Sequence, residues 1–340
     1  MKNKNIPIIL TLVALVCISL LVVILAFGEQ TILPTTTSED AYYPKKPQQL
    51  TFGENQYTNL TWSLDGRKIA FTGFNPESST TFLLTIDVAS KKIDEFAQVD
   101  GSVSELMWSP DGLRIAFCIN QLLDKMNYNV LGYYSFIDKK VHRITKLQRS
   151  SLWPLWANDG NKLVVMEQRA DESPSMRFVK GIVSVEKEDM FALGTIPDLK
   201  VPKAVFTDDN NNIWMSDYDW TNAKRLTFQG QYYSVALSPD EKKIAYIGGD
   251  NLYWMDIATL KPTKVGKGSN PTWSKDSDKI AYQIIEYADI AVISSDIWVV
   301  SIDGLKQLFH AYGTEPVWSP AKDELAYIAN GNVFIIRINP

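Results

Sequence analysis

The sequence is poor in the residues that many enzymes use for nucleophilic and metal chemistry. Its 340 residues include only two His and two Cys. It has no Gly-x-Ser-x-Gly elbow, no phosphate-binding glycine loop, no His-Glu-x-x-His motif and no Cys pair with zinc spacing. We expect His142 and His310 to lie on strand surfaces without a catalytic role. The residues therefore predict no catalytic site and no cofactor.

Thiols and positive charge are also scarce. Cys118 is the only Cys after residue 28, so that part of the chain forms no internal disulfide, and its place after Phe117 in an expected strand predicts a buried, unreactive thiol. Without residues 1–28, the chain has 32 Lys and Arg against 39 Asp and Glu. This excess of negative charge disfavours nucleic acid and anionic lipid headgroups as main partners.

One long apolar run, residues 6–27, stands at the N-terminus. It is long enough to cross a hydrocarbon layer of about 30 Å, and Lys2 and Lys4 before it favour a cytoplasmic residue 1–5 segment. Cleaved signal peptides usually have apolar cores of about 7 to 15 residues, so we expect an uncleaved, single-pass signal anchor. Ala26-Phe27-Gly28 leaves cleavage open. Residues 28–46 are expected to be a flexible linker, and residues 47–340 a domain outside the cytoplasm, periplasmic or extracellular.

A short phrase that recurs six times determines the expected architecture of that domain. An apolar residue is followed by Ser-Pro-Asp-Gly or a variant, and then by Lys/Arg-Ile-Ala-Phe/Tyr. The copies are Trp62-Ser-Leu-Asp-Gly-Arg-Lys-Ile-Ala-Phe71, Trp108-Ser-Pro-Asp-Gly-Leu-Arg-Ile-Ala-Phe117, Trp156-Ala-Asn-Asp-Gly-Asn-Lys-Leu-Val-Val165, Leu237-Ser-Pro-Asp-Glu-Lys-Lys-Ile-Ala-Tyr246, Trp273-Ser-Lys-Asp-Ser-Asp-Lys-Ile-Ala-Tyr282 and Trp318-Ser-Pro-Ala-Lys-Asp-Glu-Leu-Ala-Tyr327.

The spacing of the copies predicts seven repeats. Their first residues are 46, 48, 81, 36 and 45 residues apart, so the longest step spans two periods. Lys203-Ala-Val-Phe206 aligns with the second half of the phrase and divides that step into 41 and 40 residues. Repeats of about 43 residues are typical of four-stranded propeller blades.

Each phrase predicts a hairpin, because Pro-Asp-Gly favours a tight turn between its two apolar ends. The chain ends after a third strand, Val333-Phe-Ile-Ile-Arg-Ile338, whereas Gln48-Gln-Leu-Thr-Phe52 matches the expected fourth strand Lys224-Arg-Leu-Thr-Phe228. We therefore expect an all-β fold: a seven-bladed β-propeller over residues 47–340, closed by an N-terminal strand and preceded by one N-terminal transmembrane helix. The recurring Trp residues are expected to pack between neighbouring blades.

The Trp-Ser-Pro-Asp-Gly-Lys-Lys-Ile-Ala-Phe pattern resembles the hallmark turn of the TolB-like β-propeller family, and the resemblance covers almost everything after the linker. It implies a propeller fold. It departs from TolB itself, which has six blades and an N-terminal α/β domain, so partners of TolB are not transferred. Propellers of this type also gate prolyl oligopeptidase-like enzymes, but we expect no hydrolase domain for this propeller to gate.

A binding surface is expected on the face opposite the uniform turns. In a propeller, the inner strand begins on the face that carries the loops joining the second and third strands, and we expect long, irregular loops there at residues 73–81, 120–129, 168–176 and 285–295. The residue three before each phrase should lie near the channel mouth, and several aromatic residues lie nearby. The candidate ligand-binding residues are Asn59, Glu105, Trp153, Ser234, Asn270, Glu315, Tyr232 and Tyr312.

Two functions remain open. The favoured one is a membrane-anchored, non-catalytic binding or scaffold module for an envelope or extracellular protein, peptide or glycan, because the residues show no catalytic constellation. The alternative is a lactonase-like, metal-dependent hydrolase in which Asn59, Glu105, Asn270 and Glu315 hold Ca²⁺. The same polar residues would also be expected if the channel mouth were hydrated and bound no ligand. The sequence does not indicate the oligomeric state.

Overall fold

The computed structural model describes most of the repeat region. The described residues are 46–53, 55–75, 77–157, 160–168, 178–184, 189–191, 203–208, 210–217, 222–288 and 291–338. The expected membrane anchor, residues 6–27, and nearly all of the expected linker lie outside them. Within the described part of the chain, no helix has the length and apolar character needed to cross a membrane.

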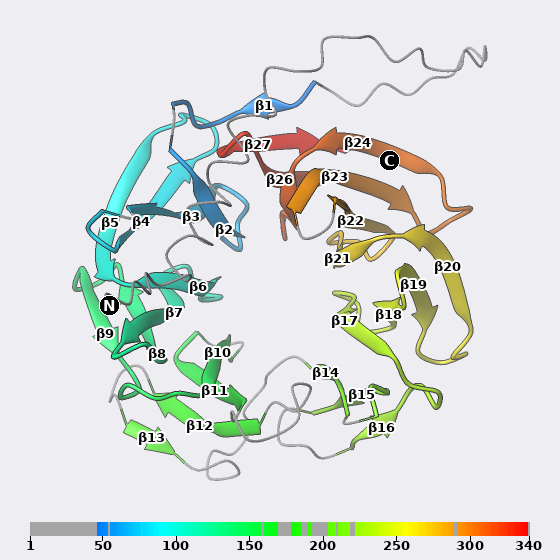
Figure 1. Cartoon of the computed structure of the whole chain (residues 1–340), viewed down its shortest axis with the longest axis horizontal. Coiled ribbons are helices and arrows are strands. Elements are labelled where there is room, and N and C mark those ends of the chain that lie inside the picture. Colours follow the sequence, from blue (N-terminus) through cyan, green and yellow to red (C-terminus); the bar gives the residue numbers. More distant parts are fainter. Residues whose placement is uncertain are drawn as a thin grey trace, which may run out of the picture. The chain divides into compact units, whose positions relative to one another are not determined.

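The described residues form seven antiparallel sheets, which follow one another in chain order (Figure 1). The first sheet is β2 (Tyr57–Trp62), β3 (Lys68–Asn75), β4 (Thr80–Asp87) and β5 (Ile93–Asp100). The second is β6 (Ser102–Trp108), β7 (Arg114–Leu123), β8 (Met126–Ser135) and β9 (Lys140–Arg143). The third is β10 (Ser151–Trp156), β11 (Lys162–Gln168), β12 (Phe178–Ser184) and β13 (Asp189–Phe191).

The remaining sheets repeat the same order of strands. The fourth is β14 (Ala204–Thr207), β15 (Ile213–Ser216) and β16 (Lys224–Arg225). The fifth is β17 (Tyr232–Leu237), β18 (Lys243–Gly248), β19 (Asn251–Asp256) and β20 (Pro262–Lys267). The sixth is β21 (Ser269–Trp273), β22 (Lys279–Ala288), β23 (Ala291–Ser301) and β24 (Gln307–Tyr312). The seventh is β25 (Thr314–Trp318), β26 (Glu324–Ala329), β27 (Asn332–Arg337) and β1 (Gln48–Gln49).

The fourth sheet and the tip of the β22–β23 hairpin differ from the regular pattern. The predicted hidden repeat corresponds to the fourth sheet: Ala204–Thr207 forms the strand that the alignment of Lys203–Phe206 predicts, and the expected strand before it lies outside the described residues. Residues Glu286–Ile293, at the tip of the β22–β23 hairpin, do not belong to the larger compact unit. That unit consists of Pro44–Ile285 and Ser294–Pro340.

The recurring phrase folds as the predicted hairpin because its Ser and Asp satisfy the backbone of the turn. Ser63 Oγ donates to Asp65 Oδ1 at 2.7 Å and accepts from the Lys68 backbone N–H at 2.9 Å. Ser109 and Ser238 make the equivalent bonds to Asp111 and Asp240. Gly66 has a φ of 64°, the left-handed conformation that favours glycine at this position of the turn.

The segment after the linker is the fourth strand of the last sheet, as predicted. Gln48 and Gln49 pair with Ile335 and Phe334, and Figure 1 shows β1, in blue, beside β27, in red. The Leu50 N–H continues this pairing with a bond to Val333 O, and Thr51 Oγ1 accepts the Val333 N–H at 2.9 Å. The last strand of the fourth sheet, β16, follows β15 directly in the chain and ends in the same two bonds. Leu226 N–H donates to Ile213 O, and Thr227 Oγ1 accepts the Ile213 N–H.

Neighbouring sheets contact each other through their first strands, with the phrase Trp between them. The strand contacts join β2 to β6, β6 to β10, β17 to β21, β21 to β25, and β25 to β2. Trp62, Trp156 and Trp273 are buried, and each indole N–H donates to a carbonyl of the preceding sheet: Val317 O, Met107 O and Ala236 O. The prediction that these rings pack between sheets is confirmed. Trp108 and Trp318 are also buried, but their indole N–H groups have no acceptor within the described residues.

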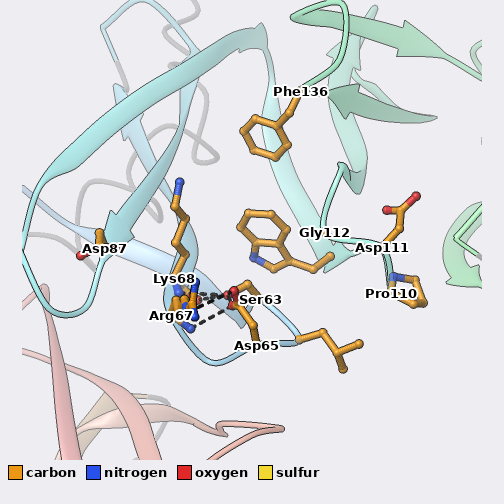
Figure 2. A pocket seen from close by; sticks show the side chains of 11 residues that line it. Ser63, Asp65, Arg67, Lys68, Asp87, Pro110, Asp111, Gly112 and Phe136 are labelled. Carbon is orange, nitrogen blue, oxygen red and sulfur yellow. Dashed lines mark hydrogen bonds and ion pairs between the residues drawn. The ribbon is translucent and has the colours of Figure 1, made fainter.

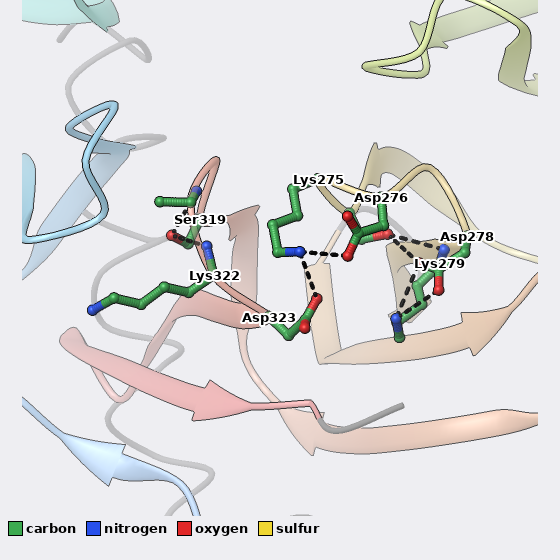
Figure 3. Close-up of polar contacts among 9 residues, drawn as sticks. Lys275, Asp276, Asp278, Lys279, Ser319, Lys322 and Asp323 are labelled. Atoms are coloured by element: carbon green, nitrogen blue, oxygen red, sulfur yellow. Dashed lines mark hydrogen bonds and ion pairs between the residues drawn. The ribbon is translucent and has the colours of Figure 1, made fainter.

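The Ser-Pro-Asp-Gly turns also touch one another. At the sixth and seventh sheets, Lys275 Nζ lies 3.8 Å from Asp323 Oδ1, and Figure 3 shows this ammonium between Asp276 and Asp323 (Figure 3). A Cβ on Gly66 would lie 2.8 Å from Ser319 Oγ, so the first turn packs against the seventh. Asp240 N–H donates to Ser277 Oγ at 3.1 Å between the fifth and sixth.

The predicted irregular loop at residues 120–129 is wrong, and so is the one at residues 73–81, where β3 and β4 pair regularly as far as Asn75 and Thr80. β7 and β8 continue as a regular ladder to the pair Leu123 and Met126, and only Asp124 and Lys125 lie between them. Both have positive φ, 50° and 64°, which gives a two-residue turn whose twist matches that of the flanking strands. The sequence signal was missed because Asp-Lys lacks the glycine that usually marks such a turn.

Candidate functional site

Five of the eight predicted site residues occupy the same bulge in five inner strands. Asn59, Glu105, Ser234, Asn270 and Glu315 all have φ between 49° and 58°. In each strand the pairing skips at this point, so the inner strand carries one extra residue relative to its neighbour. A left-handed residue with a side chain is strained by about 1 kcal/mol. The sequence offset therefore identified a repeated and strained backbone feature.

The bulges lie toward the face predicted for binding. Three inner strands, β2, β6 and β21, begin beside a loop that joins the second and third strands of a neighbouring sheet. Tyr57 N–H donates to Gly331 O, Gly101 N–H to Ser79 O, and Gly268 N–H to Asp250 O. In these sheets, the start of the inner strand and a loop between second and third strands therefore lie side by side.

Glu315 and Asn59 join three successive sheets. Glu315 Oε2 accepts the Asn59 backbone N–H at 2.6 Å, and Asn59 Nδ2 donates to Val103 O at 2.8 Å in the second sheet. Burial raises the pKa of Glu315 above its usual value, because loss of hydration outweighs the bonds from the Asn59 and Leu60 N–H groups. Both predicted residues are thus engaged in contacts between sheets.

Ser234 and Asn270 form a second, separate network. Ser234 Oγ lies 3.4 Å from Asn270 Oδ1, and Asn270 Nδ2 donates to Gln283 Oε1 at 3.1 Å. Gln283 Nε2 continues to Ser295 Oγ at 3.3 Å, and both of these residues are buried. The chain of bonds links the fifth sheet to the sixth.

Glu105 is exposed, and its charge acts on Cys118 in the next strand. Burial, with a smaller contribution from Glu105, raises the pKa of the Cys118 thiol to about 12. A thiol that stays protonated at neutral pH is a weak nucleophile, which supports the prediction of an unreactive residue.

The predicted aromatic residues divide into two groups. Tyr232 packs edge-on against Tyr246, with ring centroids 5.2 Å apart, and therefore belongs to the blade core. Trp153 is half-buried in a strand that pairs without a bulge. Tyr312 is 55% exposed at the end of β24, and Tyr233, beside Tyr232, is 50% exposed. Of the predicted aromatic residues, Tyr312 is therefore the exposed one, and its counterpart Tyr233, which is not among the eight candidates, is exposed as well.

Both histidines have structural partners. His142 Nε2 lies 2.8 Å from Asp138 Oδ2, and its ring stacks on Tyr133 at 4.7 Å. His310 Nε2 lies 3.2 Å from Asp296 Oδ1, and its ring packs against Trp298 at 4.4 Å. Across the described ranges, no three His, Cys, Asp or Glu side chains gather closely enough to hold a metal ion.

Sequence reasoning missed a cavity on the opposite face, between the turns of the first two sheets. It has a volume of about 710 Å³ and is lined by Ser63, Leu64, Asp65, Arg67, Lys68, Asp87, Trp108, Pro110, Asp111, Gly112 and Phe136. Figure 2 shows the segment from Ser63 to Lys68 on one side, and Gly112, Asp111 and Phe136 on the other (Figure 2). The only sequence signal is Phe136, which replaces the Val or Ile found at this position in four other repeats: Val88, Ile257, Ile302 and Ile338.

Comparison with known proteins gives a likeness of fold. No family model and no curated protein matches the sequence. A structure from a study of two prolyl endopeptidases has a TM-score of 0.53 and 16% identity, and the match covers 78% of this chain and 44% of that one. TolB from Acinetobacter baumannii has a TM-score of 0.49 and 15% identity, with 80% and 64% covered. An oligogalacturonate lyase in complex with manganese has a TM-score of 0.40 and 10% identity, with 88% and 96% covered.

At these sequence identities, the matches show a likeness of fold. At 16% identity, the prolyl endopeptidase match shows a shared fold and carries no activity over to this chain. The chain spans less than two thirds of the length of that protein and of the Acinetobacter TolB.

Proposed function

We propose that this chain is a seven-bladed β-propeller that binds a partner without catalysing a reaction. The closure of the propeller is supported by the fourth-strand bonds that Leu50 and Thr51 make to β27, and by the Trp62 bond to Val317 between the first and seventh sheets. The binding face is the one where the inner strands begin.

The observation that carries the binding function is the contrast between polar and apolar groups on that face. Asn59, Asn270 and Glu315 already use their polar atoms in bonds within and between sheets. The rings of Tyr233 and Tyr312, by contrast, are half exposed, although the Tyr233 hydroxyl donates to Gly249 O. Exposed aromatic rings are typical of surfaces that contact proteins, peptides or glycans. The chemistry available there favours contact over catalysis.

The tip of the β7–β8 hairpin extends this surface. Leu122, Leu123 and Met126 are 71%, 42% and 45% exposed, and they lie at the end of the second sheet that carries the loops of this face. Solvent-exposed apolar groups on a rigid ladder lose little conformational freedom when a partner covers them.

The proposal includes a membrane-bound location. The apolar segment 6–27 with Lys2 and Lys4 before it would place the propeller outside the cytoplasm, so the partner would be an envelope or extracellular protein, peptide or glycan. The calcium-dependent hydrolase is less favoured, because Asn59 and Glu315 belong to one bonded network and Asn270 belongs to another.

Replacement of both exposed tyrosines tests the binding face. The full chain would be used as bait in a pull-down from envelope extract, and the Tyr233→Ala/Tyr312→Ala variant is expected to lose the partners that the wild type captures. Its melting temperature should change little, because half-exposed rings contribute little to folding. Leu113→Ala, which removes a 44% exposed side chain from a turn on the opposite face, is the matched control and should capture normally.

Two results would refute this proposal. One is equal capture by the double variant and the wild type, and the other is turnover of a lactone or ester that depends on added Ca²⁺. A loss of folding in the double variant would show instead that the two rings belong to the blade cores.

A further inference from the structure

We propose that the cavity between the first two turns is a second binding site, for a small monoanionic ligand with an apolar ring. It lies on the face opposite Tyr233 and Tyr312, so it is independent of the partner-binding function.

The first two sheets contact each other through β2 and β6, but at the turn end of this junction the contacts that join other neighbouring turns are missing. Trp62, Trp156 and Trp273 each bond to the preceding sheet, but the Trp108 indole N–H has no acceptor within the described residues. At the Trp318 junction, which also lacks the bond, Lys275 and Asp323 bridge the turns. No hydrogen bond or ion pair joins the described turn at Ser63–Lys68 to the one at Ser109–Arg114.

Neighbouring turns on either side are closely packed, so the gap is specific to this pair. The first turn meets the seventh at Gly66, and the second meets the third at Gly160, whose added Cβ would lie 2.7 Å from Asp111. Arg114 Nη1 also donates to Gly160 O at 3.3 Å. The two turns that border the cavity are thus fixed by their outer neighbours.

The rings of Trp108 and Phe136 form the apolar wall of the cavity, and Phe96 and Tyr134 support Phe136 from outside the lining. Trp108 and Phe136 are stacked with centroids 5.5 Å apart and an angle of 12° between planes. Phe136 packs edge-on against Tyr134 at 5.1 Å and lies 5.5 Å from Phe96. These contacts hold Phe136 at the cavity, and Leu64 and Pro110 add to its apolar lining. Such a wall favours a flat ring.

The carboxylates of the lining are already occupied by their own turns. Asp65 Oδ1 accepts from Ser63 Oγ and the Arg67 N–H, and the Ser63 bond is the main reason that the pKa of Asp65 is lowered. Asp87 Oδ1 accepts from the backbone and hydroxyl of Ser90, which lowers its pKa in the same way. Asp111 accepts from Ser109 Oγ and pairs with Arg114 at 2.8 Å.

The polar groups left for a ligand are therefore donors. Lys68 Nζ makes no hydrogen bond or ion pair with another described residue. Asp87 lies opposite Lys68 in the neighbouring strand, and the Lys68 charge contributes to the lowered pKa of Asp87. Arg67 is 79% exposed and reaches Asp65 only at 3.8 Å. The lining carries three carboxylates and two cations, and Arg114, which lies outside the lining, neutralises Asp111. The net charge is then zero, so a ligand with one negative charge can pair with Lys68 or Arg67, whereas the Asp side chains would repel a phosphate dianion more strongly.

The test compares a charged probe with its neutral isostere. Indole-3-acetate carries the ring and one carboxylate, and indole-3-acetamide has the same shape without the charge. Both are titrated calorimetrically into the full chain in matched nonionic detergent, with inorganic phosphate as a third probe. We expect indole-3-acetate to bind more tightly than the amide, and phosphate to give no heat.

Three variants separate the parts of the site. Lys68→Gln should weaken indole-3-acetate about fivefold and leave the amide within about twofold, because only the charge contact is lost. Phe136→Ile should weaken both probes about fivefold, because it removes the aromatic wall. It should fold, since Ile257, Ile302 and Ile338 occupy the equivalent position. Lys243→Gln changes the residue equivalent to Lys68 in the fifth sheet and should alter neither affinity.

Several results would overturn the proposal. They are no binding of either indole probe to the wild type at millimolar concentrations, equal affinities for the acid and the amide, unchanged binding in both Lys68→Gln and Phe136→Ile, or an equal loss in Lys243→Gln.

Discussion

The Thr51 hydroxyl gives a direct test of whether the N-terminal strand completes the last sheet in solution. Thr51 is fully buried; its Oγ1 accepts the Val333 N–H at 2.9 Å and donates to Asn332 Oδ1 at 3.0 Å. Thr51→Val keeps the volume and the branching of the side chain but removes both bonds. The buried Val333 N–H and Asn332 Oδ1 would then each lack a partner.

The expected loss is set by those two groups. Leaving one buried donor or acceptor unpaired costs about 1–3 kcal/mol, so Thr51→Val, which leaves two, should lower the free energy of unfolding by about 2–6 kcal/mol. Thr227 is the matched control, because its Oγ1 accepts the Ile213 N–H at 2.8 Å in a strand that is continuous with its sheet. Thr227→Val should cost about 1–3 kcal/mol.

Urea unfolding of the full chain, followed by tryptophan fluorescence, would measure both losses under one set of conditions. If Thr227→Val is destabilising but Thr51→Val changes the free energy of unfolding by less than about 0.5 kcal/mol, the N-terminal strand does not hold the last sheet. The argument for a closed ring would then fail, although the individual sheets would stand.

Two further predictions concern the junctions between sheets. Trp62→Phe should cost about 1–3 kcal/mol more than Trp108→Phe in urea unfolding, because only Trp62 loses a bond and leaves Val317 O unpaired; equal costs would contradict this. Burial raises the pKa of Glu315 above 4.5, so its native carboxyl keeps its proton longer than the unfolded one, and stability falls as pH rises from 4.5 toward neutrality. Glu315→Gln should flatten that part of the melting-temperature profile, and an unchanged slope would show that Glu315 does not cause it.

The sequence predicted those features that depend on local chemistry. The Ser, Asp and Gly of each phrase build a turn from residues within a few positions of one another. The hairpins and their repetition could therefore be predicted from the sequence. The match between Gln48–Phe52 and Lys224–Phe228 was also informative, because the same Leu and Thr make the same bonds in both strands.

The features that the sequence did not reveal depend on neighbouring sheets. The offset before each phrase pointed to Asn59 and Glu315, but not to the bond between them, because it joins residues 256 positions apart. The cavity beside Phe136 arises from a missing contact between two turns, and a missing contact leaves no motif. The Asp124-Lys125 turn was mistaken for part of a loop because Asp124 is followed by Lys125 and not by the Gly that usually completes such a turn.

The closing strand also determines how the protein would respond to mechanical load. β1 has two residues and lies at the outer edge of its sheet, directly after the segment expected to reach the membrane. A pull on residues before Gln48 would act on this strand first and break its few backbone bonds one after another. The N-terminal strand would peel away at low tension, while the sheets that follow it in the chain would not yet bear the force.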